Sequence, residues 1–180
     1  MLRYSATPRM SNGVAVDVER LVRDALDIDV AYIEGLTIRG HRLLGALLPA
    51  QKLLLVEAHD IQERQRFTIA HECGHLILDY RNAGSPSLFG DFSTGLFGCG
   101  TLDIDATAAE PPWRKRREIL ANKFAVRLLM PAELCRSLFR QDTTLEFCAR
   151  ELFVSKETCR IRFSELGFVD AHDGPPGRLL

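Results

Sequence analysis

The chain has 180 residues, of which 46% are hydrophobic and 26% are charged, and its formal net charge is −1. This length allows one domain with a sizeable core, and the composition is ordinary for a soluble globular protein. A net charge near zero argues against a surface that attracts nucleic acid or anionic membranes as a whole, and no apolar run is long enough to span a bilayer.

Five cysteines are scattered along the chain without any CxxC pair, at positions 73, 99, 135, 148 and 159. An odd number without close pairing is untypical of a disulfide framework or of a thiolate zinc site, and it favours reduced thiols. The first residues, "MLRYSATPRMSNG", lack the apolar core of a signal peptide. We therefore expect a cytoplasmic protein with no membrane partner.

The first half of the chain predicts two helices around a group of short strands. After a flexible start over residues 1–13, "DVERLVRDAL" has the apolar spacing of an amphipathic helix. Glycines and Pro49 then separate short β-leaning pieces, the last of which is Lys52–Ala58. Asp60 and Glu63 resemble a capping box, so a second helix should begin near Ile61 and end around residues 81–84.

The second half predicts a long loop followed by helices. Residues 83–112 are rich in Gly, Ser and Pro and are interpreted as a loop insertion. "WRKRREILANKFAVRLLM" then predicts a helix that Pro131 ends, followed by a helix over "PAELCRSLF" and two more around the turn "FVS". Residues 170–180 read as a flexible tail.

These elements predict an α+β fold, in which a small mixed or antiparallel sheet packs on the second helix and a helical segment follows. The predicted organisation has a first domain over residues 1–131. A C-terminal helical segment with helix-turn-helix length would then cover residues 132–169.

The second predicted helix carries the pattern HExxH in "RFTIAHECGHLILDY". Four residues advance a helix by about 400°, so His71 and His75 project from one face and can bind one Zn²⁺ together. Glu72 lies about 100° round from His71, where it can act as a general base on a water at the metal. HExxH also occurs by chance, but ionisable groups in an apolar helix are costly to bury unless they are paired, which favours a metal.

A catalytic zinc site needs a third protein ligand. The extended pattern HExxHxxGxxH is absent, because Leu78 and Arg81 occupy its Gly and His positions. Glu118 in "REILAN" is the best candidate, since it lies on a predicted helix. Asn122 shares its face and could accept a hydrogen bond from the free N–H of a ligand histidine. Other candidate ligands are Asp103, Asp105 and Glu110, and Glu118 could also be a surface charge within a basic run.

"RFTIAHECGHLILD", "REILANKFAVRLLMP" and "FVSKETCRIRFSELGF" together resemble the ImmA/IrrE family of intracellular metallopeptidases. The resemblance covers roughly residues 52–80 and 114–169. It implies a thermolysin-like zincin with His71, His75 and Glu118 as zinc ligands and Glu72 as the general base. Leu120 stands where the family pattern usually has a second glutamate, and Cys73 stands where an aliphatic residue is commoner.

The resemblance also implies a function: cleavage of a transcriptional repressor or another helix-turn-helix regulator. The alternative is a non-proteolytic zinc-containing regulator that binds a repressor or DNA, although acidic residues interrupt the basic ones of the last two helices. A purely structural zinc would have no use for Glu72.

Several features leave their roles open at this point. The strand Lys52–Ala58 could offer an edge to a substrate peptide. The basic run Arg114–Arg117 could meet an acidic partner or could be a solvated helix start. Cys99 is a free loop thiol or a latent zinc ligand. The residue that stabilises the oxyanion could be Tyr80, His59 or His172.

Overall fold

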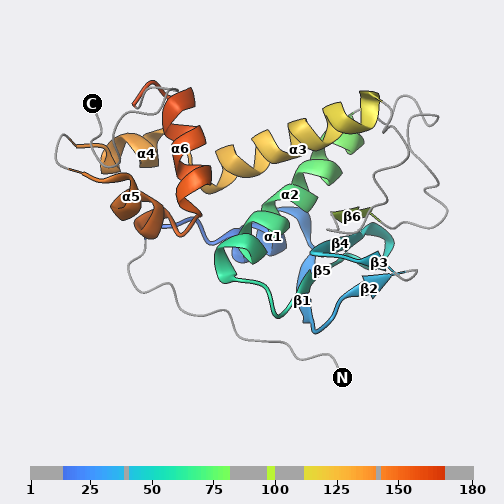
Figure 1. Cartoon of the computed structure of the whole chain (residues 1–180). Coiled ribbons are helices and arrows are strands. Elements are labelled where there is room, and N and C mark those ends of the chain that lie inside the picture. The colour runs from blue at the N-terminus through green and yellow to red at the C-terminus, as the bar shows by residue number, and fades with distance from the viewer. Residues whose placement is uncertain (1–13, 39–40, 82–96, 100–111, 141–142, 169–180) are drawn as a thin grey trace. The chain divides into compact units, whose positions relative to one another are not determined.

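A computed structural model describes residues 14–38, 41–81, 97–99, 112–140 and 143–168 (Figure 1). The chain forms two compact units. The described part of the first lies within residues 18–125, and that of the second comprises residues 14–17 and residues from 126 onward. Among the described residues, no helix is long and apolar enough to cross a membrane.

The first unit contains a four-stranded mixed sheet with the strand order β1-β5-β4-β6. Strand β1 runs parallel to β5, and β4 runs antiparallel to both β5 and β6. Strands β2 and β3 form a separate antiparallel pair. The bounds are Asp29–Ile33 for β1, Thr37–Ile38 for β2, His41–Arg42 for β3, Gly45–Leu48 for β4, Leu53–Glu57 for β5 and Phe97–Cys99 for β6.

Helix α2, Gln62–Arg81, packs on this sheet and contacts β4, β5 and β6. Helix α1, Val18–Leu26, packs against both α2 and β1. Apolar side chains from both helices and from the sheet are fully buried between them, among them Val22, Leu47, Leu54, Val56 and Ile69. The predicted α+β fold, with a mixed sheet on the HExxH helix, is confirmed.

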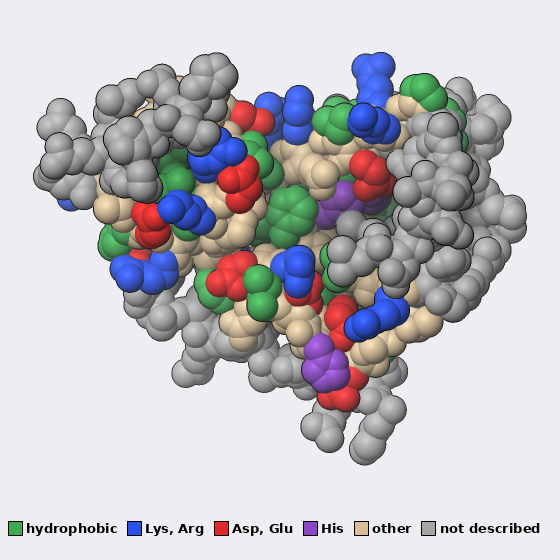
Figure 2. All heavy atoms as spheres, in the orientation of Figure 1, with side chains coloured by type: hydrophobic (Ala, Val, Ile, Leu, Met, Phe, Trp, Pro, Cys, Tyr) green, Lys and Arg blue, Asp and Glu red, His purple; other side chains and the backbone are tan. Residues whose placement is uncertain are grey.

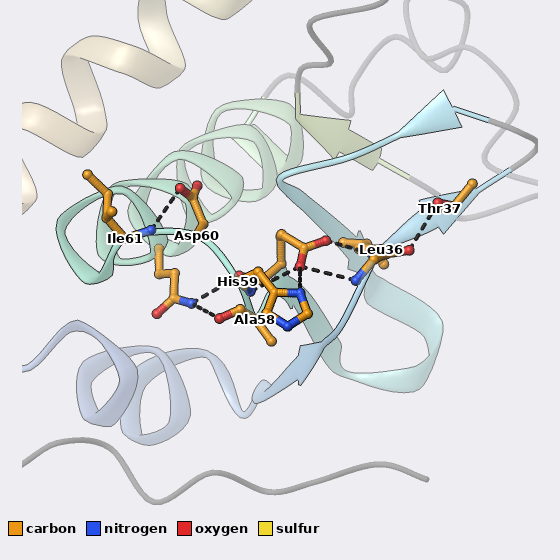
Figure 3. Close-up of polar contacts among 9 residues, drawn as sticks. Leu36, Thr37, Ala58, His59, Asp60 and Ile61 are labelled. Carbon is orange, nitrogen blue, oxygen red and sulfur yellow. Dashed lines mark hydrogen bonds and ion pairs between the residues drawn. The ribbon is translucent and has the colours of Figure 1, made fainter.

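The loop that leads into α2 is held by the buried carboxylate of Glu57, at the end of β5. Two of its partners, Leu36 and His59, are labelled in Figure 3. Its oxygens accept hydrogen bonds from the backbone N–H groups of Gly35, Leu36 and His59, at 3.1, 2.7 and 3.0 Å. Burial disfavours the charged form of Glu57, but these three donors outweigh burial and lower the pKa of the carboxyl. The carboxylate therefore joins the loop after β1 to the loop that begins α2.

Helix α3, Pro112–Leu129, belongs to the first unit up to Ala125 and to the second from Val126 onward. The short helix α4, Ala132–Leu138, follows it. Two further helices follow, α5 over Leu145–Leu152 and α6 over Lys156–Glu165. Their N-caps are Thr144 and Ser155, and each cap side chain accepts a hydrogen bond from the backbone N–H three residues later. Buried side chains of the second unit include Leu129, Met130, Cys148, Leu152, Cys159 and Phe163.

The structure adds two features that the sequence did not predict. Strand β6 lies within the expected loop 83–112 and pairs with β4. Strand β5 lies between β1 and β4, so both of its sides are already hydrogen-bonded and it offers no edge to a peptide. Pro112, at the end of the expected loop, already belongs to the next helix. Residues 83–96 and 100–111 of that loop, the expected flexible start and the expected tail lie outside the described residues.

Candidate metal centre

His71 and His75 lie one turn apart on α2 and are both almost fully buried. Their rings meet edge to face with centroids 4.6 Å apart, and their Nε2 atoms are 2.9 Å apart. The helical spacing i, i+4 therefore brings the same nitrogen of each ring to one point.

Glu118 on α3 lies opposite this pair of nitrogens. Its carboxylate oxygens are each 3.3 Å from an Nε2 atom, Oε2 from that of His71 and Oε1 from that of His75. Burial raises the pKa of this half-buried carboxyl, but its close contacts with the two imidazoles outweigh burial and hold the pKa well below its usual range. One donor atom from each of the three residues lies within 4.8 Å of the others.

Gly74 explains how α3 comes close enough to deliver Glu118. A methyl group added at Gly74 would lie 3.1 Å from the Cα and 3.2 Å from the backbone oxygen of Ala121. Ala121 lies between Glu118 and Asn122 on α3, so this close approach of the two helices falls beside the histidine pair. The missing side chain at Gly74 thus lets α3 approach α2 closely next to the site.

Asn122 fixes the tautomer of His71. Its Oδ1 lies 2.8 Å from Nδ1 of His71 and can only accept, so Nδ1 carries the hydrogen. The lone pair of this imidazole is then on Nε2, which faces Glu118. Nδ1 of His75 is also buried, and it has no hydrogen-bond partner among the described residues.

The donor set fits a zinc ion. Two imidazole nitrogens and one carboxylate form the His₂Glu ligand set of catalytic zinc sites. Metal–donor bonds of about 2.0–2.1 Å place neighbouring donors of a tetrahedral site about 3.3 Å apart. Both nitrogen–oxygen distances match this value. The 2.9 Å between the two nitrogens would have to widen by a few tenths of an ångström.

Glu72 is completely buried, next to the strand β4. A methyl group added at Gly45 on β4 would overlap the Cγ2 methyl of Thr68 and lie 3.6 Å from Cγ of Glu72. The missing side chain at Gly45 thus lets α2 lie close to the sheet next to Glu72. In the sequence, Gly45 reads only as one of the glycines that separate short strands, and no spacing rule indicates this contact.

Cys73, which follows Glu72, is buried and is not one of the clustered ligand atoms. Burial, with a smaller contribution from the charge of Glu72, raises the pKa of its thiol to about 12. Cys73 therefore packs in the interior as a small apolar side chain.

The other candidate residues do not join the cluster in the described structure. The side chain of His59 is mostly exposed and pairs with Glu57 at 3.5 Å, just before α2 begins (Figure 3). About nine residues of helix, or roughly 13 Å, separate the beginning of α2 from His71. Asp103, Asp105, Glu110 and His172 lie outside the described residues, as do the side chains of Tyr80 and Cys99.

Comparisons with known proteins agree with this architecture. Residues 23–164 match the family model of the IrrE N-terminal-like domain, Peptidase_M78. A solved structure, a transcriptional regulator from Mycobacterium tuberculosis, is similar in fold, with a TM-score of 0.56 and 21% sequence identity. The match covers 82% of this chain and 39% of that one, so the chain spans about two fifths of the regulator's length. A comparison with curated proteins finds no match.

Proposed function

The chain belongs to the IrrE N-terminal-like domain family, Peptidase_M78, and from this premise we propose that it is a zinc metalloendopeptidase that cleaves a transcriptional regulator. The observation that carries the proposal is the convergence of His71, His75 and Glu118 from two helices onto one point. Neutral imidazoles and a carboxylate are the ligands that a catalytic zinc ion takes while keeping a position open for water or substrate.

Each residue of the site has a separate task in this proposal. His71, His75 and Glu118 hold the metal, and Asn122 keeps the lone pair of His71 on Nε2. Zinc, when bound, lowers the pKa of water from about 15.7 towards about 7 and polarises the scissile carbonyl. Glu72 takes the proton from the attacking water and passes it to the leaving amine.

The burial of Glu72 suits this task. Glu72 is fully buried and directly follows a proposed zinc ligand, so its carboxylate is shielded from bulk water beside the proposed metal.

The proposed substrate is a repressor or another helix-turn-helix regulator. Two observations support this class of substrate: the family of the chain, and the fold shared with a protein named as a transcriptional regulator. We propose a protein substrate that is cleaved within an extended segment, because the backbone carbonyl must reach the water from which Glu72 would take a proton.

The alternative, a non-proteolytic regulator that binds DNA through α5 and α6, receives less support. The basic side chains there are paired with acidic ones: Lys156 with Glu146, Arg160 with Glu157 and Arg150 with Glu151. A surface that binds DNA needs cations that are available to phosphates.

The test is incubation with helix-turn-helix repressors of the same organism, with and without a chelator, followed by mass spectrometry. We expect a defined cleavage that the chelator abolishes and added zinc restores. Glu72→Gln should bind zinc but leave the substrate intact. Cleavage by Glu72→Gln at the parent rate would refute the mechanism.

A further inference from the structure

One exposed face of α3 combines apolar and basic side chains in a single stripe. We call this the basic-apolar face and define it by Trp113, Arg116, Ile119, Leu120 and Lys123. The side chains of Trp113, Ile119 and Leu120 are 50%, 44% and 43% exposed, and Arg116 and Lys123 are also exposed. Large apolar side chains that are this exposed and lie together on one face, within about three helical turns, are typical of an interaction site.

The basic-apolar face lies on the side of α3 turned away from the metal cluster. At about 100° per residue, Arg116, Leu120 and Lys123 are roughly 140° to 200° round from Glu118. Ala121 and Ala125, which are fully buried, lie on the opposite side from this face. The face is therefore separate from the proposed metal site, although the same helix carries both.

The cations of this face are available for a partner. Neither Arg116 nor Lys123 forms an ion pair with a described residue, whereas most other basic side chains of the structure have acidic partners. Figure 2 shows blue and green side chains gathered along the upper edge of the molecule, over α3. The net charge of the whole chain is −1, so this local positive charge is not a general property of the surface.

We propose that the basic-apolar face of α3 is an exosite that binds an acidic, apolar segment of the protein substrate. This inference rests on the proposed peptidase function and adds a chemical class of substrate to it. Such a segment would place apolar side chains on Ile119 and Leu120 and carboxylates on Arg116 and Lys123. Apolar contacts would supply affinity, and charge complementarity would supply selectivity and faster association.

Charge and composition argue against the other occupants. A second copy of the chain docked through the same face would bring two sets of unpaired cations together, because a two-fold interface apposes identical surfaces. Duplex DNA would contact the cations but would leave three apolar side chains without a partner. An acidic, apolar peptide satisfies both kinds of side chain.

Trp113 is the only tryptophan of the chain, so its emission reports on this face directly. The experiment uses the full chain as Glu72→Gln, to prevent cleavage, and a synthetic 16-residue peptide without aromatic residues. The peptide carries leucine at helical positions i, i+3, i+4 and i+7 and glutamate on the flanking positions. A matched peptide carries lysine in place of every glutamate.

We expect the acidic peptide to shift the Trp113 emission to shorter wavelength in a saturable way, and the basic peptide to leave it unchanged. The double variant Arg116→Glu, Lys123→Glu should weaken this binding at least about tenfold, and Leu120→Ser, which keeps every cation, several-fold. The control Arg136→Glu, Arg140→Glu has the same change in charge on exposed residues elsewhere and should bind like the parent.

No emission shift with the acidic peptide, or equal binding of both peptides, would overturn the exosite. Tighter binding of duplex DNA or of anionic phosphatidylserine vesicles than of the acidic peptide would also overturn it. Hydrolytic activity is measured separately, on an unstructured peptide without acidic residues. If the parent hydrolyses this peptide but the emission test fails, the exosite is wrong and the peptidase function stands. If the acidic peptide binds but the parent hydrolyses nothing, the peptidase function is wrong and only the binding face stands.

Discussion

A methyl group added to Gly74 would lie 3.1 Å from the Cα of Ala121, so α2 and α3 are in backbone contact beside the histidine pair. This contact fixes how far the carboxylate of Glu118 reaches across to the two imidazoles. The geometry of the proposed zinc site thus depends on a residue that carries no ligand atom.

Gly74→Ala should therefore affect metal binding more than folding. The added methyl group must displace the backbone of α3 by a few tenths of an ångström, which moves Glu118 relative to His71 and His75. Alanine also favours a helix by about 1 kcal/mol over glycine, so the free energy of unfolding without metal should change by less than about 1 kcal/mol. Competition with a chromophoric chelator should show a zinc affinity several-fold weaker than that of the parent.

Gly45→Ala is the comparison for this variant. Its added methyl group meets Thr68 and Glu72 and leaves the contact between α2 and α3 untouched. It should lower the free energy of unfolding by about 1–3 kcal/mol through overpacking and leave the zinc affinity close to that of the parent. Unchanged zinc affinity in Gly74→Ala would show that the helix contact does not set the ligand geometry.

Asn122→Ala should weaken zinc binding by about 10- to 100-fold, the usual effect of removing the group that orients a ligand histidine. The thermal stability without metal should stay close to that of the parent, because Asn122 is exposed. Asn122→Asp keeps an acceptor for Nδ1 of His71 and should retain most of the affinity. Equal zinc affinities for all three proteins would contradict the orienting role of Asn122.

The carboxylate of Glu57 should make stability depend on pH in the acidic range. Its pKa in the folded chain is lowered, so its contribution is complete above the pKa of the unfolded chain, about 4.3, and is lost as the pH falls through the folded pKa. Glu57→Gln should cost about 1–3 kcal/mol at pH 7, because an uncharged amide accepts the three backbone hydrogen bonds less well.

The difference between the parent and Glu57→Gln should shrink as the pH falls from 5 to 3, and urea unfolding at each pH measures it. The exposed Glu34→Gln is the control, with an expected change of less than about 0.5 kcal/mol at any pH. A difference that stays constant across this pH range would mean that the charge of Glu57 is not what stabilises the loops.

Four thiols should resist alkylation in the folded protein. Cys73, Cys135, Cys148 and Cys159 are buried, and burial is the main cause that raises the pKa of each, to about 12 for Cys73 and Cys159 and about 11 for Cys148. Since the thiolate is the reactive form, iodoacetamide at pH 8 should leave these four unmodified for minutes and label them after unfolding. Rapid native labelling of any of them, located by peptide mass spectrometry, would show that its core opens.

Much of the fold and of the candidate site follows from local sequence signals. The apolar spacing that begins after Asp17 and the signals around Asp60 and Ser155 predicted helices that the structure contains. The spacing of His71 and His75 alone predicts that both rings share a face, because the helical period is fixed. The place of Glu118 opposite them follows from the resemblance to known metallopeptidases and from its position on a helix.

The features that the sequence did not predict depend on contacts between distant residues. Strand β6 has only three residues, too few for a periodic pattern, and becomes a strand by pairing with β4, about fifty residues earlier. The central position of β5 depends on β1, more than twenty residues before it. The role of Gly45 arises from the packing of α2 on the sheet, which no local pattern encodes.

Zinc binding by the parent and by Glu118→Ala tests whether the three side chains form a metal centre. Zinc content by mass spectrometry and affinity by chelator competition should give one zinc per chain for the parent and at least about a hundredfold weaker binding for Glu118→Ala. The exposed Glu133→Ala, on α4, is the control and should bind zinc like the parent. No zinc in the parent, or an unchanged affinity in Glu118→Ala, would contradict a metal centre built from His71, His75 and Glu118.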